Sequence, residues 1–156
     1  MRCVIQRSGP ARVTVGDRVT GSIARGLVVL VAFQPGDTAR ELAWMAHKLP
    51  RLRIFRDSQD KMNCSLLDVG GELLLVSQFT LYGDCRKGMR PGFTGSAPGD
   101  QARGLYLQFG KMLRDEGLVV AEGEFGAMME VSLVNDGPVT LILDREAPDP
   151  APEVAP

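Results

Sequence analysis

The chain has few of the side chains that enzymes most often use as bases, nucleophiles or metal ligands. Its 156 residues include one histidine, His47, and three cysteines that form no CxxC pair. A Ser-His-Asp or Cys-His mechanism would depend on that single histidine, and isolated cysteines make neither a zinc knuckle nor a redox dithiol. We therefore expect no metal and no cofactor, and chemistry carried out largely by the backbone.

His47 falls within an apolar pattern that predicts an amphipathic helix over residues 38–49. Thr38 and Glu41 have the spacing of a capping box, and the apolar residues recur on one face. His47 lies off that face beside Lys48, which favours a solvated surface imidazole over a catalytic base.

Long apolar runs and a strong net charge are also absent. No stretch is long enough to cross a bilayer, and the unpaired thiols are typical of a reducing compartment, so we expect a cytoplasmic protein with no membrane partner. The net charge is −1 at pH 7, although the residues before Asp144 carry two more basic than acidic side chains. This small excess predicts weak, salt-sensitive contact with RNA and no DNA partner.

Proline and alanine are concentrated at the C-terminal end, in residues 146–156, which we expect to form a disordered or extended tail. Residues 1–145 contain no visible linker or repeat and form one predicted domain. A chain of this length buries roughly 68–70% of its unfolded surface, which is enough for a core without disulfide bonds.

Strand patterns dominate the body, and two helix patterns interrupt them. The second helix follows Asp100 and ends before Gly117. Strands are predicted over residues 2–7, 11–15, 18–22, 27–33, 52–55, 72–77, 119–124, 129–135 and 139–143. The expected fold is α/β: a single β-rich domain of mostly antiparallel strands, barrel-like or in layered sheets, with two main helices packed on one side. No GxGxxG or GxxxxGK sequence follows a strand, which argues against nucleotide binding through a phosphate loop.

Two short polar segments stand between strand-like flanks, Ser77-Gln78-Phe79-Thr80 and Asn135-Asp136-Gly137-Pro138. On local chemistry alone the second segment is a turn between strands. Ser77 and Thr80 have no base nearby in sequence, so on the same grounds they are strand residues with satisfied hydroxyl groups. Gln78 can be a surface amide, although among apolar neighbours it needs hydrogen-bond partners.

Together with other segments, these two motifs resemble the D-aminoacyl-tRNA deacylase family. The resemblance runs in order from the first strand to about Asp144 and covers nearly the whole body. It is carried by residues 62–72, 77–82, 87–91, 125–126 and 135–140. The chain departs from the family pattern at Cys85, Met89, Gly92 and Met128. These departures concern tRNA contact and local packing and leave both polar motifs intact.

The resemblance implies an enzyme that hydrolyses the ester between a D-amino acid, or achiral glycine, and the terminal adenosine of tRNA. It also implies a β-rich homodimer with the active site at the subunit interface. The Gly137-Pro138 dipeptide, with a cis peptide bond, would enter the pocket of the other subunit. The catalytic segment that faces the ester would be Ser77, Gln78, Phe79 and Thr80. Phosphate contacts with tRNA would come from Arg86, Lys87 and Arg90, for which the alternative is a solvated, mobile loop.

An aminoacyl ester is already activated, so such an enzyme mainly needs to orient it, hold the developing oxyanion and admit water. The backbone N–H groups of Phe79 and Thr80 are candidates for the oxyanion site. The carbonyl groups of Gly137 and Pro138 are candidates for holding the substrate's ammonium group, which would drive an L side chain into the backbone. Glycine has no side chain to clash, so this filter accepts it.

Two functions of other classes remain open from the sequence. One is a non-catalytic homo-oligomer that binds RNA or a small ligand with the same fold. The other is a Thr80-dependent hydrolase that acts on a different ester. Hydrolysis measured on D- and L-aminoacyl-tRNA separates all three.

Overall fold

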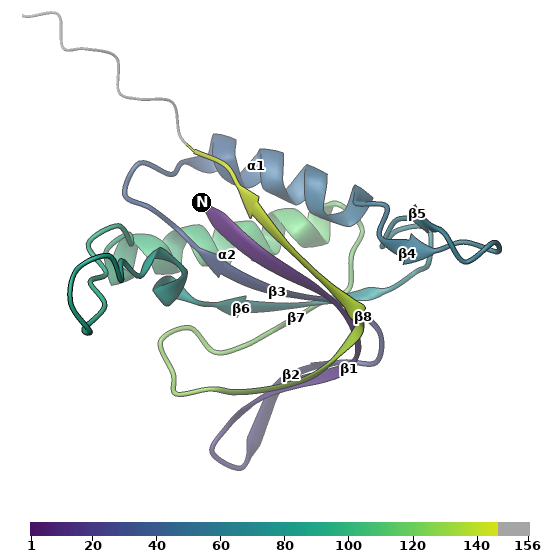
Figure 1. Ribbon diagram of the computed structural model, residues 1–156, viewed down its shortest axis with the longest axis horizontal. Helices are drawn as coiled ribbons and strands as arrows, with labels where there is room; N and C mark the ends of the chain where they lie inside the picture. The colour runs from purple at the N-terminus through teal and green to yellow at the C-terminus, as the bar shows by residue number, and fades with distance from the viewer. Residues whose placement is uncertain (147–156) are drawn as a thin grey trace, which may run out of the picture.

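The structure is a computed structural model, and it describes residues 1–146 of the chain. This part forms a curled mixed sheet with two main helices on one of its faces (Figure 1). The predicted fold class is confirmed. The tail predicted over residues 146–156 lies, apart from Glu146, outside the described residues.

Six strands make the main sheet, in the order β2-β1-β3-β6-β7, with β8 also pairing with β1. Their bounds are β1 (Arg2–Val15), β2 (Arg18–Ile23), β3 (Gly26–Ala32), β6 (Glu72–Ser77), β7 (Val120–Glu122) and β8 (Glu130–Asp144). β1 pairs antiparallel with β2, β3 and β8, whereas the β3–β6 and β6–β7 pairs are parallel. Parallel neighbours need a crossover connection, and the segment that contains α1 (Ala39–Lys48) supplies it between β3 and β6.

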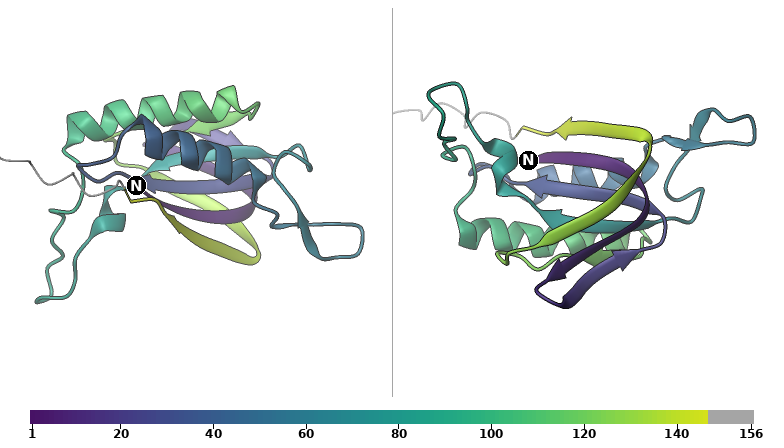
Figure 2. Two further views of the ribbon diagram at one scale, coloured as in Figure 1. Left: turned by 90° about the horizontal axis from the view of Figure 1, so that it is seen from above. Right: turned by 60° about the horizontal axis from the view of Figure 1, so that its bottom comes forward.

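β1 and β8 are each one long strand where the sequence predicted two. β1 pairs with β3 up to Ser8 and with β2 from Ala11, so Gly9 and Pro10 mark a change of partner and not the end of a strand. β8 pairs with both halves of β1 and so continues through the segment predicted as a turn. The exchange of partners curls the sheet over itself into a nearly closed barrel (Figure 2).

The barrel closes where β2 comes against β7. A Cβ atom on Gly21 would lie 2.4 Å from the carbonyl oxygen of Glu122, so only glycine permits this approach. The curled sheet encloses a small core made by Ala11, Val13, Ile23, Val28, Leu74 and Val76. A larger core lies between the sheet and the helices.

The two helices cover the same face of the sheet, as Figure 2 shows. α1 begins with the predicted capping box: the Thr38 hydroxyl accepts the N–H of Arg40 at 3.3 Å, and Glu41 accepts the N–H of Thr38 at 2.9 Å. A 3-10 turn, η1 (Leu49–Arg51), follows α1. α2 (Gly99–Asp115) packs beside α1 and buries Tyr106, Phe109 and Leu113.

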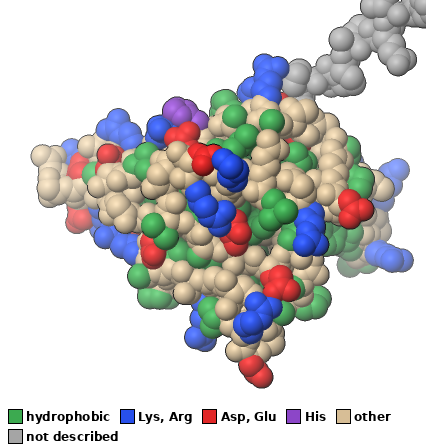
Figure 3. All heavy atoms as spheres, turned by 180° about the vertical axis from the view of Figure 1, so that it is seen from behind, with side chains coloured by type: hydrophobic (Ala, Val, Ile, Leu, Met, Phe, Trp, Pro, Cys, Tyr) green, Lys and Arg blue, Asp and Glu red, His purple; other side chains and the backbone are tan. Residues whose placement is uncertain are grey.

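Ion pairs cover the outer face of the helix layer. Lys111 pairs with Asp115 at 2.6 Å, and Glu116 pairs with Arg51 at 2.6 Å. Blue and red side chains are interspersed over the face seen in Figure 3, with the purple His47 at its upper edge. A surface of mixed sign produces no extended field of one sign, so this face is a poor surface for nucleic acid.

The predicted strand over residues 52–55 is wrong for three of its four residues. Only Phe55–Arg56 forms a strand, β4, which pairs with β5 (Met62–Cys64) in a separate hairpin. The N–H of Ile54 turns back to the carbonyl of Leu52 at 3.0 Å, so the chain is not extended there. The hairpin projects from the body at the end opposite η2 (Phe79–Tyr82), a short 3-10 helix (Figure 1).

Candidate active site

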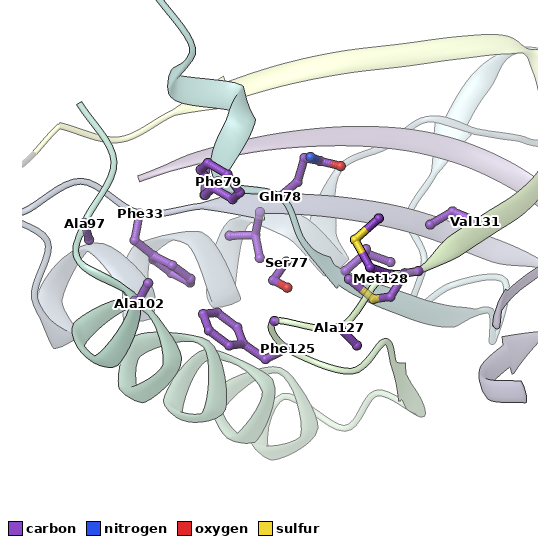
Figure 4. Close-up of a pocket in the computed structure, with 16 residues that line it drawn as sticks. Phe33, Ser77, Gln78, Phe79, Ala97, Ala102, Phe125, Ala127, Met128 and Val131 are labelled. Atoms are coloured by element: carbon purple, nitrogen blue, oxygen red, sulfur yellow. The ribbon is translucent and has the colours of Figure 1, made fainter. Parts of the chain in front are cut away.

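A pocket of about 560 Å³ opens at one end of the barrel. It lies where the ends of β3 and β6 meet the start of α2 and the loop before β8, and Figure 4 shows side chains from these segments converging on it. Most of the wall is apolar, including Phe33, Phe79, Ala102, Phe125, Met128 and Val131. An apolar pocket with a few polar groups is the usual form of a small-molecule site.

The polar side chains in the described wall are those of Ser77 and Gln78, and no histidine or carboxylate of residues 1–146 lines it. The N–H of Gln78 donates to the carbonyl of Val31 at 2.8 Å, which fixes the end of β6 against β3. Phe79 also lines the pocket, whereas Thr80 follows it in sequence but is not part of the wall. Three of the four predicted catalytic residues therefore come together at one pocket.

The backbone turns after Gln78 into η2. The first hydrogen bond of this helix runs from the N–H of Leu81 to the carbonyl of Gln78 at 3.2 Å. The N–H groups of Phe79 and Thr80 precede that bond, so they have no partner within the helix. The side-chain amide of Gln78 donates to the hydroxyl of Thr80, which ties this hydroxyl to the turn and not to a base.

Contacts outside the pocket hold the turn in place. The ring of Phe79 packs edge-on against Phe93, with centroids 5.2 Å apart, and Ser96 Oγ donates to the carbonyl of Phe79 at 2.8 Å. Arg2 donates to the carbonyl of Leu81 at 3.0 Å. Three separate contacts thus position the backbone at the start of η2.

The Gly137–Pro138 dipeptide is exposed, and it does not line this pocket. It lies opposite Arg7, between the Gln6–Thr140 and Ser8–Asn135 pairs of β1 and β8. Between these two pairs β8 advances five residues while β1 advances two, so three extra residues of β8 form an excursion from the sheet. The peptide bond between Gly137 and Pro138 is cis, as the resemblance implies.

A buried arginine holds this excursion. Arg7 is 3% exposed, and its guanidinium donates to the carbonyl oxygens of Ile54 at 2.7 Å and Asp136 at 3.1 Å. Gly137 has a φ of +130°, and a Cβ there would lie 2.8 Å from Val139 Cγ2 and 3.1 Å from Arg7 Nη2, so the position requires glycine. This role of Arg7 was not predicted from the sequence. The signal that could have found it is a charged residue within an apolar strand pattern.

Asn135 closes the base of the excursion. Its Oδ1 accepts the N–H of Val139 at 3.0 Å, and its amide donates to Thr140 Oγ1 at 2.8 Å. The amide of Gln6 donates to the same hydroxyl at 3.3 Å. These side-chain hydrogen bonds replace the backbone hydrogen bonds that are missing where the register of β1 and β8 shifts. Asn135 therefore closes a loop within β8.

The three basic residues predicted to contact tRNA lie on an exposed loop between η2 and α2. Reciprocal backbone bonds of 2.7 and 2.9 Å between Asp84 and Gly92 close the base of this loop. Arg86 forms a bidentate pair with Asp84, at 2.8 and 2.7 Å, which holds the pKa of that carboxyl well below its usual range. Lys87 and Arg90 have no ion-pair partner among residues 1–146, and none of the three basic side chains lines the pocket.

His47 is exposed at the end of α1, as predicted, with Nδ1 3.6 Å from Glu116. In the part of the chain that the structure describes, no group of three or more His, Cys, Asp or Glu side chains could hold a metal ion. None of the helices described is long and apolar enough to span a membrane. Cys3, Cys64 and Cys85 are all free thiols, and burial raises the pKa of Cys3.

Comparison with known proteins assigns the family. A family model described as D-Tyr-tRNA(Tyr) deacylase matches residues 4–144, so the chain belongs to this family. The D-aminoacyl-tRNA deacylase of Geobacillus sp. (strain WCH70) is 56% identical over 146 residues, which are 94% of this chain and 96% of the relative. That of Thermus aquaticus is 57% identical over 144 residues, 92% of this chain and 95% of the relative.

Solved structures share the fold. The structure titled "c-Myc DNA Unwinding Element Binding Protein" is 41% identical, with a TM-score of 0.88, and the match covers 94% of this chain and 100% of that one. A probable eukaryotic D-amino acid tRNA deacylase is 22% identical, with a TM-score of 0.79 and coverage of 92% and 98%, and this likeness concerns the fold alone. The family that the resemblance of five sequence segments indicated is confirmed.

Proposed function

We propose that this protein hydrolyses the ester bond of D-aminoacyl-tRNA, and of glycyl-tRNA mischarged on the wrong tRNA, releasing free amino acid and tRNA. The observation that carries the proposal is the apolar pocket bordered by the turn at Ser77-Gln78-Phe79-Thr80, with no base in its described wall. Relatives named D-aminoacyl-tRNA deacylase support the same substrate class. We place the reaction in the cytoplasm, where tRNA is charged and used.

This reaction requires little of the side chains. Because an aminoacyl ester is already activated, orientation and oxyanion stabilisation supply most of the catalysis. The N–H groups of Phe79 and Thr80, which have no partner within η2, donate to the developing oxyanion. The substrate's vicinal 2′-hydroxyl helps to orient the attacking water. Neither step requires a side-chain base, a metal or a cofactor.

The backbone of Gly137 and Pro138 selects the hand of the substrate. Its carbonyl oxygens accept hydrogen bonds from the substrate's ammonium group. An L side chain is then driven into the backbone, while a D side chain leaves the pocket toward solvent. Glycine escapes this exclusion because it has no side chain, so the enzyme accepts it as well.

Gly137 and Pro138 are too far from the pocket of their own chain to act there. Arg7, beside which they lie, pairs with Leu27 near the start of β3, whereas the pocket begins at Val31. Four residues of strand at about 3.3 Å each separate the two regions by roughly 13 Å. The dipeptide therefore acts in the pocket of a second copy, and the active protein is a homodimer.

β8, which pairs only with β1 among the described strands, provides the dimer surface. Val134, Leu141 and Ile142 are 59%, 36% and 66% exposed, and they flank the Gly137–Pro138 excursion on both sides. Exposed apolar side chains along one strand mark an interaction site. A two-fold axis beside this strand brings the excursion of each chain to the pocket end of the other.

The loop after η2 contacts the acceptor end of the tRNA. Lys87 and Arg90 are free to bind phosphates, whereas Arg86 shares its guanidinium with Asp84. Contacts of this kind position the RNA and read no sequence, so they add affinity that falls with salt.

The test is deacylation of matched D-tyrosyl-tRNA and L-tyrosyl-tRNA, with glycyl-tRNA measured alongside. Release from the D and glycyl esters without release from the L ester is expected. Equal release from both hands indicates a general hydrolase, and RNA binding without release indicates a non-catalytic binding protein. A fully active monomer in sedimentation rules out the homodimer.

A further inference from the structure

We propose that the β4–β5 hairpin of one subunit contacts the phosphate backbone of the tRNA bound at the pocket of the other subunit. The proposal rests on the substrate class and the homodimer proposed above. The hairpin would be a second RNA-binding element beside the loop after η2, and the partner subunit would supply it.

A single side chain fixes the hairpin to the Gly137–Pro138 excursion. Arg7 Nη1 donates to the carbonyl of Ile54, the residue before β4, and Arg7 Nε donates to the carbonyl of Asp136, the residue before Gly137. Arg7 is buried, so the two segments are held together as one unit. When the excursion enters the pocket of the partner, the hairpin therefore arrives at the mouth of that pocket.

The hairpin stands clear of the rest of the molecule (Figure 1). Phe55 anchors one arm in the core and is 1% exposed, whereas residues 58–63 are all exposed. A two-stranded hairpin contributes little stability by itself. Its outer part is therefore available for contact beyond its own chain.

Three basic side chains on this hairpin and beside it are exposed, Arg53, Arg56 and Lys61, as is the carboxylate of Asp60. The carboxylate of Asp57 turns inward and accepts the backbone N–H groups of Gln59 at 2.8 Å and Lys61 at 3.1 Å. The hairpin thus presents cations while one of its carboxylates is occupied by the turn.

A phosphate can replace the existing partners of these cations. Arg56 meets Asp60 at 3.2 Å with both side chains more than half exposed, and such pairs contribute little. Lys61 has no ion-pair partner within residues 1–146. On the helix layer, Lys111 already has a carboxylate partner, Asp115 at 2.6 Å, although both of these side chains are also more than half exposed. The hairpin differs in its place next to the excursion and in Lys61, which gives up no partner when a phosphate binds.

The first test compares two double variants with the same loss of charge. Arg56→Gln with Lys61→Gln should raise KM for D-tyrosyl-tRNA and reduce the slope of log kcat/KM against log salt by about 2, since each lost phosphate contact reduces it by about 1. Lys48→Gln with Lys111→Gln, on the helix layer, should leave that slope as in the wild type. An unchanged slope in the hairpin variant overturns the proposal.

The same variants are then assayed on D-tyrosyl-adenosine, which has the ester but no phosphates. The defect of the hairpin variant should disappear on this substrate. A defect of equal size on both substrates shows that the hairpin acts on the fold or the pocket and overturns the proposal. A failure of the proposed function differs from a failure of this proposal. In that case the wild-type protein itself would release no tyrosine from D-tyrosyl-tRNA or from D-tyrosyl-adenosine.

Mixed dimers test the assignment in trans. One chain carries Ala127→Trp, which fills its pocket, with Ala102→Trp as a second blocking variant. With the hairpin changes on the blocked chain, the open pocket faces the altered hairpin and KM for D-tyrosyl-tRNA should rise. With the hairpin changes on the open chain, KM should equal that of a mixed dimer with no hairpin changes. The reverse result shows that the hairpin serves its own pocket and overturns the proposal.

Discussion

The two ends of the barrel are built by different means. At the pocket end the wall is apolar, and its form follows from packing between the sheet, α2 and the loop before β8. At the other end, the Gly137–Pro138 excursion is exposed and is held by hydrogen bonds from Arg7 and Asn135. Apolar walls tolerate exchanges of similar volume, whereas a hydrogen-bonded segment loses its position when one partner is removed. Substitutions should therefore separate the two ends.

The largest effect is expected from Arg7→Met, which keeps an apolar stem and removes every donor. Each lost bond from a charged donor costs about 1.5–3 kcal/mol, and the buried carbonyl of Ile54 loses its partner. A displacement of the excursion near 1 Å should lower hydrolysis of D-aminoacyl-tRNA by about 100-fold. Urea unfolding and the deacylation rate measure the two effects. Arg12→Met, exposed on the same strand, should change both little, and a normal rate in Arg7→Met would show that the excursion holds itself.

A smaller but specific effect is expected from Gly137→Ala. The added Cβ meets Val139 and Arg7, and a non-glycine residue at such a φ costs about 1–3 kcal/mol. The rate on D-aminoacyl-tRNA should fall by about 10-fold or more if a comparable cost appears in the barrier. Gly16→Ala is the matched control, because Gly16 has a φ of +58° and nothing within 4 Å of the added atom. It should lose stability and keep its activity per folded molecule, and equal activity losses in both variants would contradict the prediction.

At the pocket end, Thr80→Val should have a modest effect. The hydroxyl of Thr80 is bonded to Gln78 and to no base, while the proposed oxyanion donors are backbone groups that the substitution keeps. The expected loss is about 10-fold or less in kcat. Mass spectrometry of the enzyme quenched during turnover provides the check, since a covalent acyl group on Thr80 would establish it as the nucleophile.

The smallest effect is expected from His47→Gln. The imidazole is exposed on α1 and does not line the pocket. Because no step of the proposed reaction uses it, kcat/KM should stay within about two-fold of the wild type from pH 5.5 to 8, the range in which a histidine titrates. A loss that follows the titration of an imidazole would show that His47 takes part.

Elements whose signals are local could be predicted from the sequence. The capping box at Thr38 and Glu41 and the apolar face of α1 act within one or two turns, and both are present in the structure. The apolar run over residues 27–33 likewise predicted a strand, and the structure has β3 there at Gly26–Ala32. The β4–β5 hairpin was not predicted. The pattern of residues 52–55 indicates a strand, but the backbone turns at Ile54 and only Phe55 continues into β4.

The two polar motifs and the family were determined by the sequence alone, because each motif is a short run of adjacent residues. Their placement at opposite ends of the barrel was decided by the tertiary structure. So was the role of Arg7, whose partners Ile54 and Asp136 are 47 and 129 residues away along the chain. Local patterns carry no information about partners at such separations. The pairing of β1 with β8 brings Asp136 to Arg7, and the fold of the segment before β4 brings Ile54 there. An arginine that interrupts an apolar run thereby becomes the residue that positions Gly137 and Pro138.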